Sequence, residues 1–462
     1  MTVHEPLTTA LAEWAHRVTF VDLPPDVVHA TRLRVLDVIG LALAGADTPF
    51  GRATRAAAVA MSPQGACRVF GTGERVGVTM AAFANGACAQ ALEYDDTHNE
   101  SIVHMSSPAV AAALALSETR PVSGRDVIAA VAVGNEISCR VGSVAPGEFH
   151  KRGFHPTGLF APFGVTYLAG RLLGLDPRQM SQAAGICGSF ASGILQCWVD
   201  GTHPKFLHPG WAAQSGIAAA LLARADLTGP AQVLEGRFGL FASHLQDPGI
   251  PRDFDRVTAN LGTTWDSRNS SLKPFPAAHV IHPYLDALLR IRSRHRIASG
   301  DVERIDVPVA AFIVPIVCEP VAEKFAPASD SHGRVSLQYS LAEALHLGSL
   351  GRHAYAAASL RNPEILAIAR RVHYRVDPEF PGPGRFKGAV RVTLKDGRSF
   401  EEVEDYNRGS AENPMTPEEI RQKFDENASG FLPAAARDRL ADAIGQLECL
   451  PDASVIVSLA VA

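Results

Sequence analysis

The chain has 462 residues and a formal net charge of −5 at pH 7; 47% of its residues are hydrophobic and 20% are charged. This balance is typical of a globular protein, and the length predicts two to three domains. The weak negative charge argues against nucleic-acid binding or binding to a membrane surface, and no apolar run is long enough to span a bilayer. The N-terminus lacks the pattern of a signal peptide and the seven cysteines include no CxxC pair, so we expect a cytoplasmic protein with reduced thiols.

The first part of the chain, up to about residue 245, predicts consecutive helices. Apolar residues recur at three- and four-residue spacing over 7–20, 25–44, 125–141 and 157–173. Asp176-Pro177 is typical of a helix start, with Asp as the cap and Pro in the first turn. Pro209-Gly210 predicts the start of another apolar helix over 211–225.

After about residue 270 the pattern changes to a mixture of strands and helices. Residues 304–309 alternate like a strand, and 336–347 predict a helix. Residues 389–394 and 399–403 predict a hairpin around Asp396-Gly397.

Helix returns near the C-terminus, because Thr416-Pro-Glu-Glu419 has the spacing of a capping box before a pattern that runs to about residue 443. We therefore expect a mainly α fold with an α+β part. The predicted large all-helical domain covers 1–270 and is completed by 410–462. The smaller α+β lid domain covers 271–409.

Five polar clusters interrupt the apolar stretches. The first is Glu93-Tyr-Asp95-Asp96-Thr97-His98, with His104 at the end of the same loop. Carboxylates next to histidines suit acid–base chemistry or a metal. The alternative is a structural loop, since Asx residues often bond to turns.

The second cluster is a single His155 just before a predicted helix, where a histidine that only stabilises the turn is the alternative. The third is Asp200-Gly-Thr-His203-Pro-Lys205-Phe-Leu-His208, which ends at a predicted helix start. Backbone N–H groups, the helix dipole and a lysine together favour a carboxylate. The alternative is a solvated basic loop.

The fourth cluster runs from Lys273 to His282 and lies at the predicted domain junction, where clefts form. The fifth is Tyr339, which opens a helix of the lid domain; a core tyrosine is the alternative, and a lone tyrosine at such a place is more often core. No Walker loop, GxSxG elbow, HExxH or dinucleotide fingerprint is present. Lysine, histidine, tyrosine and acidic residues without a cofactor motif favour proton transfer on an anionic substrate.

At these clusters the sequence resembles the MmgE/PrpD family over nearly the whole chain. The motifs that carry the resemblance follow the family's order: Glu93–Thr97 with His104, Phe154–Thr157, Asp200–Gly210, Lys273–His282, Ser336–Tyr339 and Glu412–Thr416. The resemblance implies a large helical domain with a smaller lid, usually as a homodimer, and an active site between them. It also implies a small-molecule polycarboxylate substrate, with no metal or organic cofactor.

Two positions differ from the decarboxylase members of the family. Their loop opens with Asp where this chain has Glu93, which is one methylene longer. They carry a His five residues after the lysine that matches Lys273; here that position is Ala278, and we expect the adjacent His279 to face elsewhere. Both differences argue against cis-aconitate decarboxylation as the specific reaction.

The resemblance and the residue types together predict a catalytic set. Lys205 and Lys273 would bind carboxylates and stabilise an enolate-like charge, and His104 would move the proton. Thr97 and Tyr339 would orient the substrate or supply a hydroxyl proton, and Asp96 would orient a His or Lys. The remaining predicted substrate-binding residues are Glu93, Asp95, His155, His208 and His282.

The leading hypothesis is a lyase that eliminates water from a tricarboxylate of the 2-methylcitrate type. An epimerase would use the same deprotonation without a leaving group, and a decarboxylase-like carboxy-lyase is the other alternative. A divalent-metal hydrolase using Asp95, Asp96, His98 and His104, or a binding protein without activity, are the competing classes.

Overall fold

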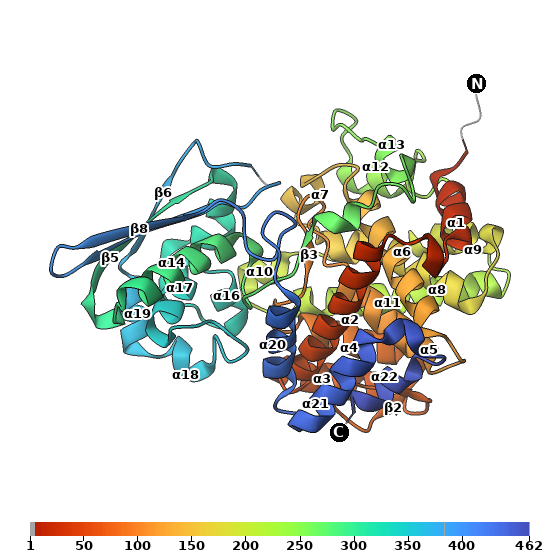
Figure 1. The fold of residues 1–462 in the computed structure, drawn as a ribbon. Coiled ribbons are helices and arrows are strands. Elements are labelled where there is room, and N and C mark those ends of the chain that lie inside the picture. Colours follow the sequence, from red (N-terminus) through yellow and green to blue (C-terminus); the bar gives the residue numbers. More distant parts are fainter. Residues whose placement is uncertain (1–4, 383, 462) are drawn as a thin grey trace.

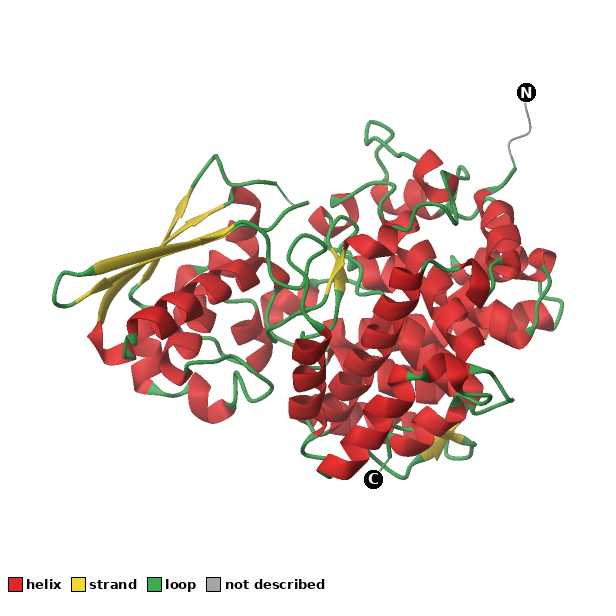
Figure 2. Ribbon diagram, in the orientation of Figure 1, coloured by secondary structure: helices red, strands yellow, loops and turns green. Residues whose placement is uncertain are grey.

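The computed structural model describes residues 5–382 and 384–461. These residues form two lobes that lie side by side (Figure 1). The larger lobe is helical, and the four-stranded sheet belongs to the smaller lobe (Figure 2). The predicted mainly α fold with an α+β part is therefore confirmed. Residues 1–4 and 462 of the predicted helical domain, and residue 383 of the predicted lid, lie outside the described residues.

The centre of the larger lobe consists of helices that are buried on nearly every side. All residues of α5 are buried, as are those of α4 from Met80 onward. A helix that is apolar all round belongs inside a large domain. The helices of this lobe from the first part of the chain are α1 (Leu7–Arg17), α2 (Pro25–Ala46), α3 (Pro49–Met61), α4 (Val78–Gln90), α5 (Ser106–Ser117), α6 (Gly124–Gly142), α8 (Pro156–Leu173), α9 (Pro177–Cys187) and α11 (Pro204–Arg224).

Helix α11 begins at Pro204, so the predicted start at Pro209-Gly210 was wrong. Pro204 occupies the first helical position, where a missing N–H costs nothing, and Pro209 lies inside the helix. Gly210 serves packing, because a Cβ added there would lie 2.2 Å from the backbone oxygen of Phe83 in α4. The early start places Lys205 in the first turn of a long, buried helix.

Three C-terminal helices return to the larger lobe: α20 (Pro417–Ala428), α21 (Ala434–Gly445) and α22 (Ser454–Leu459). The predicted capping box is present, because Thr416 Oγ1 accepts from Glu419 N and Thr416 N donates to Glu419 Oε2. Lys423 Nζ lies 2.8 Å from Asp37 Oδ1 of α2, which fixes α20 against the first half of the chain. The single helix predicted through residue 443 is in fact two helices, and Pro433 caps the second.

The smaller lobe is a sheet with helices packed on it. Its strand order is β6-β5-β7-β8, with β5 parallel to β6 and antiparallel to β7. The predicted strand, helix and Asp396-Gly397 hairpin are present, but the edge strand β6, with its charged and polar side chains, was not predicted. The elements are β5 (Val302–Val309), β6 (Val372–Val376), β7 (Gly388–Leu394), β8 (Ser399–Glu404), α14 (His282–His295), α17 (Leu337–Leu347) and α19 (Pro363–Ala369).

Each lobe has its own hydrophobic core, one drawn from residues 11–265 and 420–460 and the other from residues 275–394. At the junction, β3 (Thr97–His98) pairs with β4 (Ser270–Ser271). Arg334 of the smaller lobe is buried there and donates to the Leu92 and Pro276 carbonyls. The domain boundaries at residues 270 and 409 stay a prediction.

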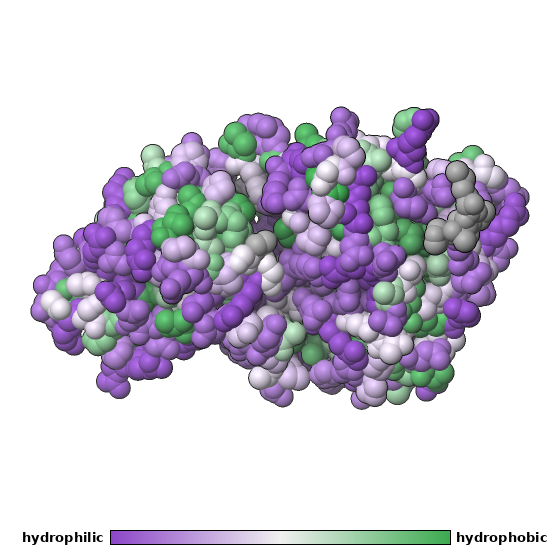
Figure 3. Space-filling model, turned by 90° about the horizontal axis from the view of Figure 1, so that it is seen from above, coloured by the Kyte–Doolittle hydropathy of each residue, from purple (hydrophilic) through white to green (hydrophobic). Residues whose placement is uncertain are grey.

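The face of the molecule that is seen from above is mostly hydrophilic over both lobes (Figure 3). Viewed from above, hydrophobic residues gather on the smaller lobe close to its junction with the larger one (Figure 3). Within the part of the chain that the structure describes, no helix is both long enough and apolar enough to cross a membrane.

Candidate active site

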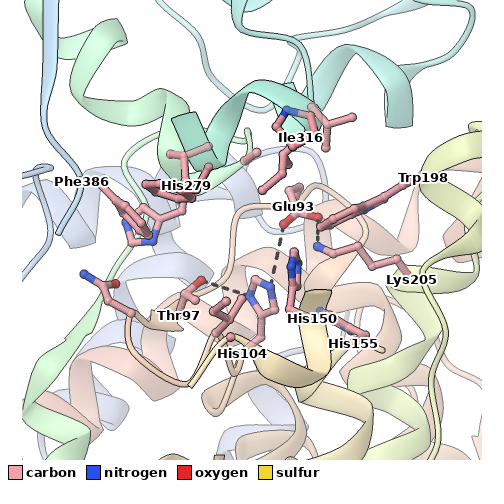
Figure 4. A pocket seen from close by; sticks show the side chains of 18 of the residues that line it. Glu93, Thr97, His104, His150, His155, Trp198, Lys205, His279, Ile316 and Phe386 are labelled. Carbon is pink, nitrogen blue, oxygen red and sulfur yellow. Dashed lines mark hydrogen bonds and ion pairs between the residues drawn. The ribbon is translucent and has the colours of Figure 1, made fainter. Parts of the chain in front are cut away.

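A cavity of about 360 Å³ lies between the two lobes and collects residues from four of the five predicted clusters. Among the predicted catalytic and binding residues, Glu93, Thr97, His104, His155, Lys205 and Lys273 line it. They come from loops and helix starts that the packing of the larger lobe brings together (Figure 4).

Glu93 is the central carboxylate of this cavity. It follows the end of α4 and adopts a left-handed backbone conformation with φ of 54°, which is unfavourable for a residue with a side chain. Its side chain is buried, and it lies between Lys205 and His104 in Figure 4.

Both predicted lysines bind the Glu93 carboxylate. Lys205 Nζ lies 2.5 Å from Oε2, and Lys273 Nζ lies 3.1 Å from Oε1 and also donates to the Glu93 carbonyl. Burial alone would raise the pKa of Glu93, but the two lysine charges outweigh it and hold the pKa far below its usual value. The cavity therefore contains an ionised carboxylate between two buried cations.

His104 presents one ring nitrogen to the cavity. Its Nδ1 lies 3.0 Å from the Asp96 carbonyl oxygen and 3.3 Å from Asp95 Oδ1. Both of those oxygens only accept, so Nδ1 carries a hydrogen and donates it. Nε2 is left facing Glu93 Oε1, 3.9 Å away, and is free to take or give a proton. Thr97 Oγ1, 3.2 Å from Nδ1, helps to fix the ring.

Asp95 and Asp96 act behind His104 and do not line the cavity. Burial would raise the pKa of Asp95, but the neighbouring His104 lowers it overall. Asp96 is turned to the helices, where it accepts from Ser106 and lies 3.4 Å from Arg34 Nε; burial raises its pKa despite that charge. Asp96 therefore contacts His104 through its backbone carbonyl oxygen and not through its carboxylate. Its role in orienting a histidine stays a prediction.

A pair of histidines stands next to His104. His155 Nδ1 and His208 Nδ1 are 2.8 Å apart and share a hydrogen bond, so at least one of the rings is neutral. Burial lowers the pKa of both, that of His208 to about 4, and the charge of Lys205 adds to the effect on His208. His155 Nε2 is buried without a hydrogen-bond partner among the described residues and lies on the cavity side of the pair.

His279 lies in the cavity wall, so the expectation that it faces elsewhere was wrong. Its Nε2 accepts from Asn407 Nδ2 at 2.7 Å, and burial lowers its pKa well below the ordinary value. In the neutral ring the hydrogen therefore sits on Nδ1, which has no hydrogen-bond partner among the described residues. Ala278 also lines the cavity. His279 therefore places an imidazole in the cavity wall.

Two predicted residues are buried in the smaller lobe and do not line the cavity. Tyr339 belongs to the hydrophobic core of that lobe, behind the Ser336 cap of α17. His282 bonds to the Ala277 carbonyl at the start of α14 and packs on Phe275. Their substrate roles stay predictions, for which the geometry gives no direct contact.

Several residues that line the cavity were not singled out from the sequence. His150 lies on a short helix before the His155 motif, and Trp198 places its ring 5.9 Å from Lys205 Nζ. Neither belongs to a motif, and the cation–π contact depends on a spatial arrangement that the sequence does not show. The smaller lobe contributes an apolar wall made of Val280, Phe312, Pro315, Ile316, Val335 and Phe386.

The four residues proposed for a metal hydrolase do not all converge: Asp95 and His104 lie 3.3 Å apart, but the other two bond elsewhere. His98 bonds to Ser101, and Asp96 bonds to Ser106. In residues 5–382 and 384–461, no group of three or more His, Cys, Asp or Glu side chains is arranged to hold a metal ion. The donors that do meet in the cavity are two lysines, several histidines and one glutamate, a set suited to binding an anion.

Comparison with known proteins agrees with this geometry. The model of the MmgE/PrpD N-terminal domain matches residues 9–253, and that of the MmgE/PrpD C-terminal domain matches residues 275–448. Cis-aconitate decarboxylase of Aspergillus terreus is 28% identical, with 98% of this chain and 95% of the relative covered. The human and mouse cis-aconitate decarboxylases are each 27% identical, with 98% of this chain and 94% and 93% of the relatives covered. The chain belongs to the MmgE/PrpD family.

Proposed function

We propose that the protein is a lyase that acts on a small carboxylic acid and moves a proton at the carbon next to a carboxylate. The observation that carries the proposal is that Lys205, Lys273 and His104 Nε2 all surround the buried carboxylate of Glu93. Removing or adding a proton beside a carboxylate passes through an enolate-like state with extra negative charge. Fixed cations in a site shielded from water stabilise that charge more than bulk water does.

Within this class we propose loss of CO2 as the bond-breaking step. The apolar wall of the smaller lobe faces the lysines across the cavity, as Ile316 and Phe386 do in Figure 4. Such a wall excludes water from the cavity, and a departing carboxylate that loses hydration inside it is raised in energy relative to neutral CO2. The relatives named as cis-aconitate decarboxylases support the same choice. Elimination of water, the leading hypothesis from the sequence, is the alternative.

The proposed loss of CO2 needs only the residues that line the cavity and a proton from water. In an unsaturated acid, the bond to the departing carboxylate breaks and its electron pair forms a new C=C bond. The former alkene carbon next to the second carboxylate gains the negative charge, which Lys205 and Lys273 stabilise. Protonated His104 donates from Nε2 to that carbon and later recovers a proton from water. CO2 and a shifted alkene are the products.

The reaction can be read directly by proton NMR in D2O with cis-aconitate, 2-methylcitrate and alkyl-substituted glutaconates. We expect CO2 release and one deuterium in the product beside a carboxylate. Loss of water from 2-methylcitrate without CO2 release would replace the decarboxylase by the dehydratase. Deuterium exchange without bond cleavage would point to an epimerase. No reaction or binding with any of these acids would overturn the proposal as a whole.

The same family resemblance supports a cytoplasmic homodimer as the working form. Light scattering on the purified protein should give twice the monomer mass. A monomer mass at all concentrations tested would contradict this part of the proposal.

A further inference from the structure

The two faces of the cavity differ sharply in chemistry. The larger lobe and the junction supply the charged groups and His104, His150 and His155, and the smaller lobe supplies His279 and the wall of Val280, Phe312, Pro315, Ile316, Val335 and Phe386. In the close-up, Ile316, Phe386 and His279 lie on one side of the cavity, and Thr97, His104 and Lys205 lie on the other (Figure 4). A ligand that fills the space must therefore be polar at one end and apolar at the other.

The polar face of the cavity carries too little positive charge to neutralise a ligand with three carboxylates. Lys205 and Lys273 carry two positive charges, and Glu93 between them removes one, which leaves one net positive charge. His150, His155 and His279 are neutral, since burial lowers the pKa of each well below the ordinary value. Lys151 at the rim is largely exposed and already paired with Glu148. One carboxylate can be matched by the lysines and a second by His104 and neutral N–H donors.

A third carboxylate would lie against the apolar wall. Within the described residues, His279 is the one polar side chain that the smaller lobe contributes to the lining. A carboxylate placed there would lose its hydration without gaining a cation. An alkyl group placed there would instead move from water to an apolar surface, which is favourable.

The size of the cavity points the same way. At about 360 Å³ it falls in the range of about 300–1,000 Å³ that holds drug-sized ligands. A compact six-carbon tricarboxylate is smaller than such ligands and would leave the wall around Phe312 and Ile316 uncovered. A longer, partly apolar acid would cover it.

We infer that the substrate is a dicarboxylate that carries an apolar arm, with its carboxylates at the lysines and His104 and its arm on the wall of the smaller lobe. This inference rests on the proposed function and deepens it, because the reaction is kept while the substrate departs from the compact tricarboxylate named for the relatives. Glu93 and the apolar wall are the features that determine this specificity.

Isothermal titration calorimetry with unreactive saturated acids tests the inference on the unmodified protein. The series is glutarate, glutarate with methyl, propyl or pentyl on its central carbon, and tricarballylate, which carries a carboxylate there. Affinity should rise about three- to fourfold per methylene, or roughly 100-fold from methyl to pentyl. Tricarballylate should bind more weakly than the propyl compound.

One variant in the apolar wall and one elsewhere in the smaller lobe test whether the wall itself binds the alkyl arm. Ile316→Asn places an amide in the wall and should reduce the gain from methyl to pentyl at least fivefold. Leu347→Asn is the matched control, because Leu347 is an exposed apolar residue of the same lobe outside the cavity. It should leave every dissociation constant unchanged.

The outcomes distinguish this inference from the proposed function. Equal affinity along the alkyl series, with tricarballylate binding most tightly, would overturn the apolar-arm inference and leave the proposed function intact. Binding that Lys273→Met does not weaken for any member would overturn both, because the carboxylates would then lie elsewhere. A steep alkyl series that depends on Lys273 but accompanies no turnover of any unsaturated analogue would support the arm site and contradict the lyase.

Discussion

Replacing Lys273 by methionine removes one of the two cations that hold the Glu93 carboxylate, with little change in side-chain volume. Lys273 is fully buried and makes two hydrogen bonds of 3.1 Å to Glu93, one to the side chain and one to the backbone. Hydrogen bonds to charged groups contribute about 1.5–3 kcal/mol. Breaking a buried pair outright costs about 3–5 kcal/mol, but Glu93 keeps Lys205. We expect the free energy of unfolding to fall by about 2–3 kcal/mol.

Activity should fall by much more than this loss of stability explains. Removing one preorganised group that stabilises developing charge lowers kcat by about 100- to 1,000-fold, which corresponds to about 3–4 kcal/mol. Because the lysine also binds the ground-state carboxylate, the dissociation constant of glutarate should rise as well. The measurements are kcat for the acid identified by NMR, calorimetry with glutarate, and urea denaturation of both proteins.

Lys423→Met is the matched control for this variant. Lys423 is also buried, pairs with the Asp37 carboxylate at 2.8 Å and donates to the Tyr94 carbonyl, but it does not line the cavity. It should lose a similar amount of stability and keep kcat within about fivefold. If Lys273→Met lost stability like the control yet kept its kcat and its affinity for glutarate, the assignment of Lys273 to the substrate would be refuted.

Three further changes have defined outcomes. Glu93→Gln removes the anion that competes with substrate for the lysines, so glutarate should bind about tenfold more tightly while kcat falls; unchanged affinity would show that Glu93 does not compete. Burial lowers the pKa of His208 to about 4 from 6.5, so only the unfolded chain takes up this proton as the pH falls through that window. This group alone should cost about 3 kcal/mol of stability by pH 4, and urea melts of His208→Gln should show a shallower decline than the unmodified protein. Thr416→Ala removes the α20 cap and should lower stability by about 1 kcal/mol in urea, with an unchanged kcat; a loss of activity would mean that α20 also positions the cavity.

Local signals in the sequence predicted those elements that have a cap, a turn motif or a regular apolar period, because each signal has a direct physical cause. The Asp176 and Thr416 caps, the Asp396-Gly397 turn and the period of the apolar residues each act within a few neighbouring residues. The start of α11 was predicted wrongly because Pro209-Gly210 resembles a helix start locally. Its glycine is set by a contact with α4, far away in the sequence, which no local pattern shows.

The candidate site was predictable in residue type more than in orientation. Lys205, Lys273 and His104 stood out as charged residues in apolar surroundings, and they meet in the cavity. Tyr339 stood out equally but belongs to the core of the smaller lobe, because a tyrosine at a helix start can point to either side. His279 was expected to face away, and only the turn that leads into α14 brings it to the cavity.

The apolar wall could not be recognised from the sequence at all. Phe312 and Ile316 are ordinary hydrophobic residues in two short helical turns of the smaller lobe, and Phe386 lies in a loop about 70 residues further along the chain. Their significance comes only from lying opposite the lysines, which is a property of how the two lobes sit together.

The central claim is that Lys205 and Lys273 stabilise charge while a proton moves at the carbon beside a carboxylate. The most direct measurement is the deuterium content of the product formed in D2O, compared between the unmodified protein and the Lys205→Met, Lys273→Met double variant. We predict one deuterium at that carbon with the unmodified protein and with Lys423→Met, and no product with the double variant. Product without deuterium, or equal product from the double variant, would contradict the account.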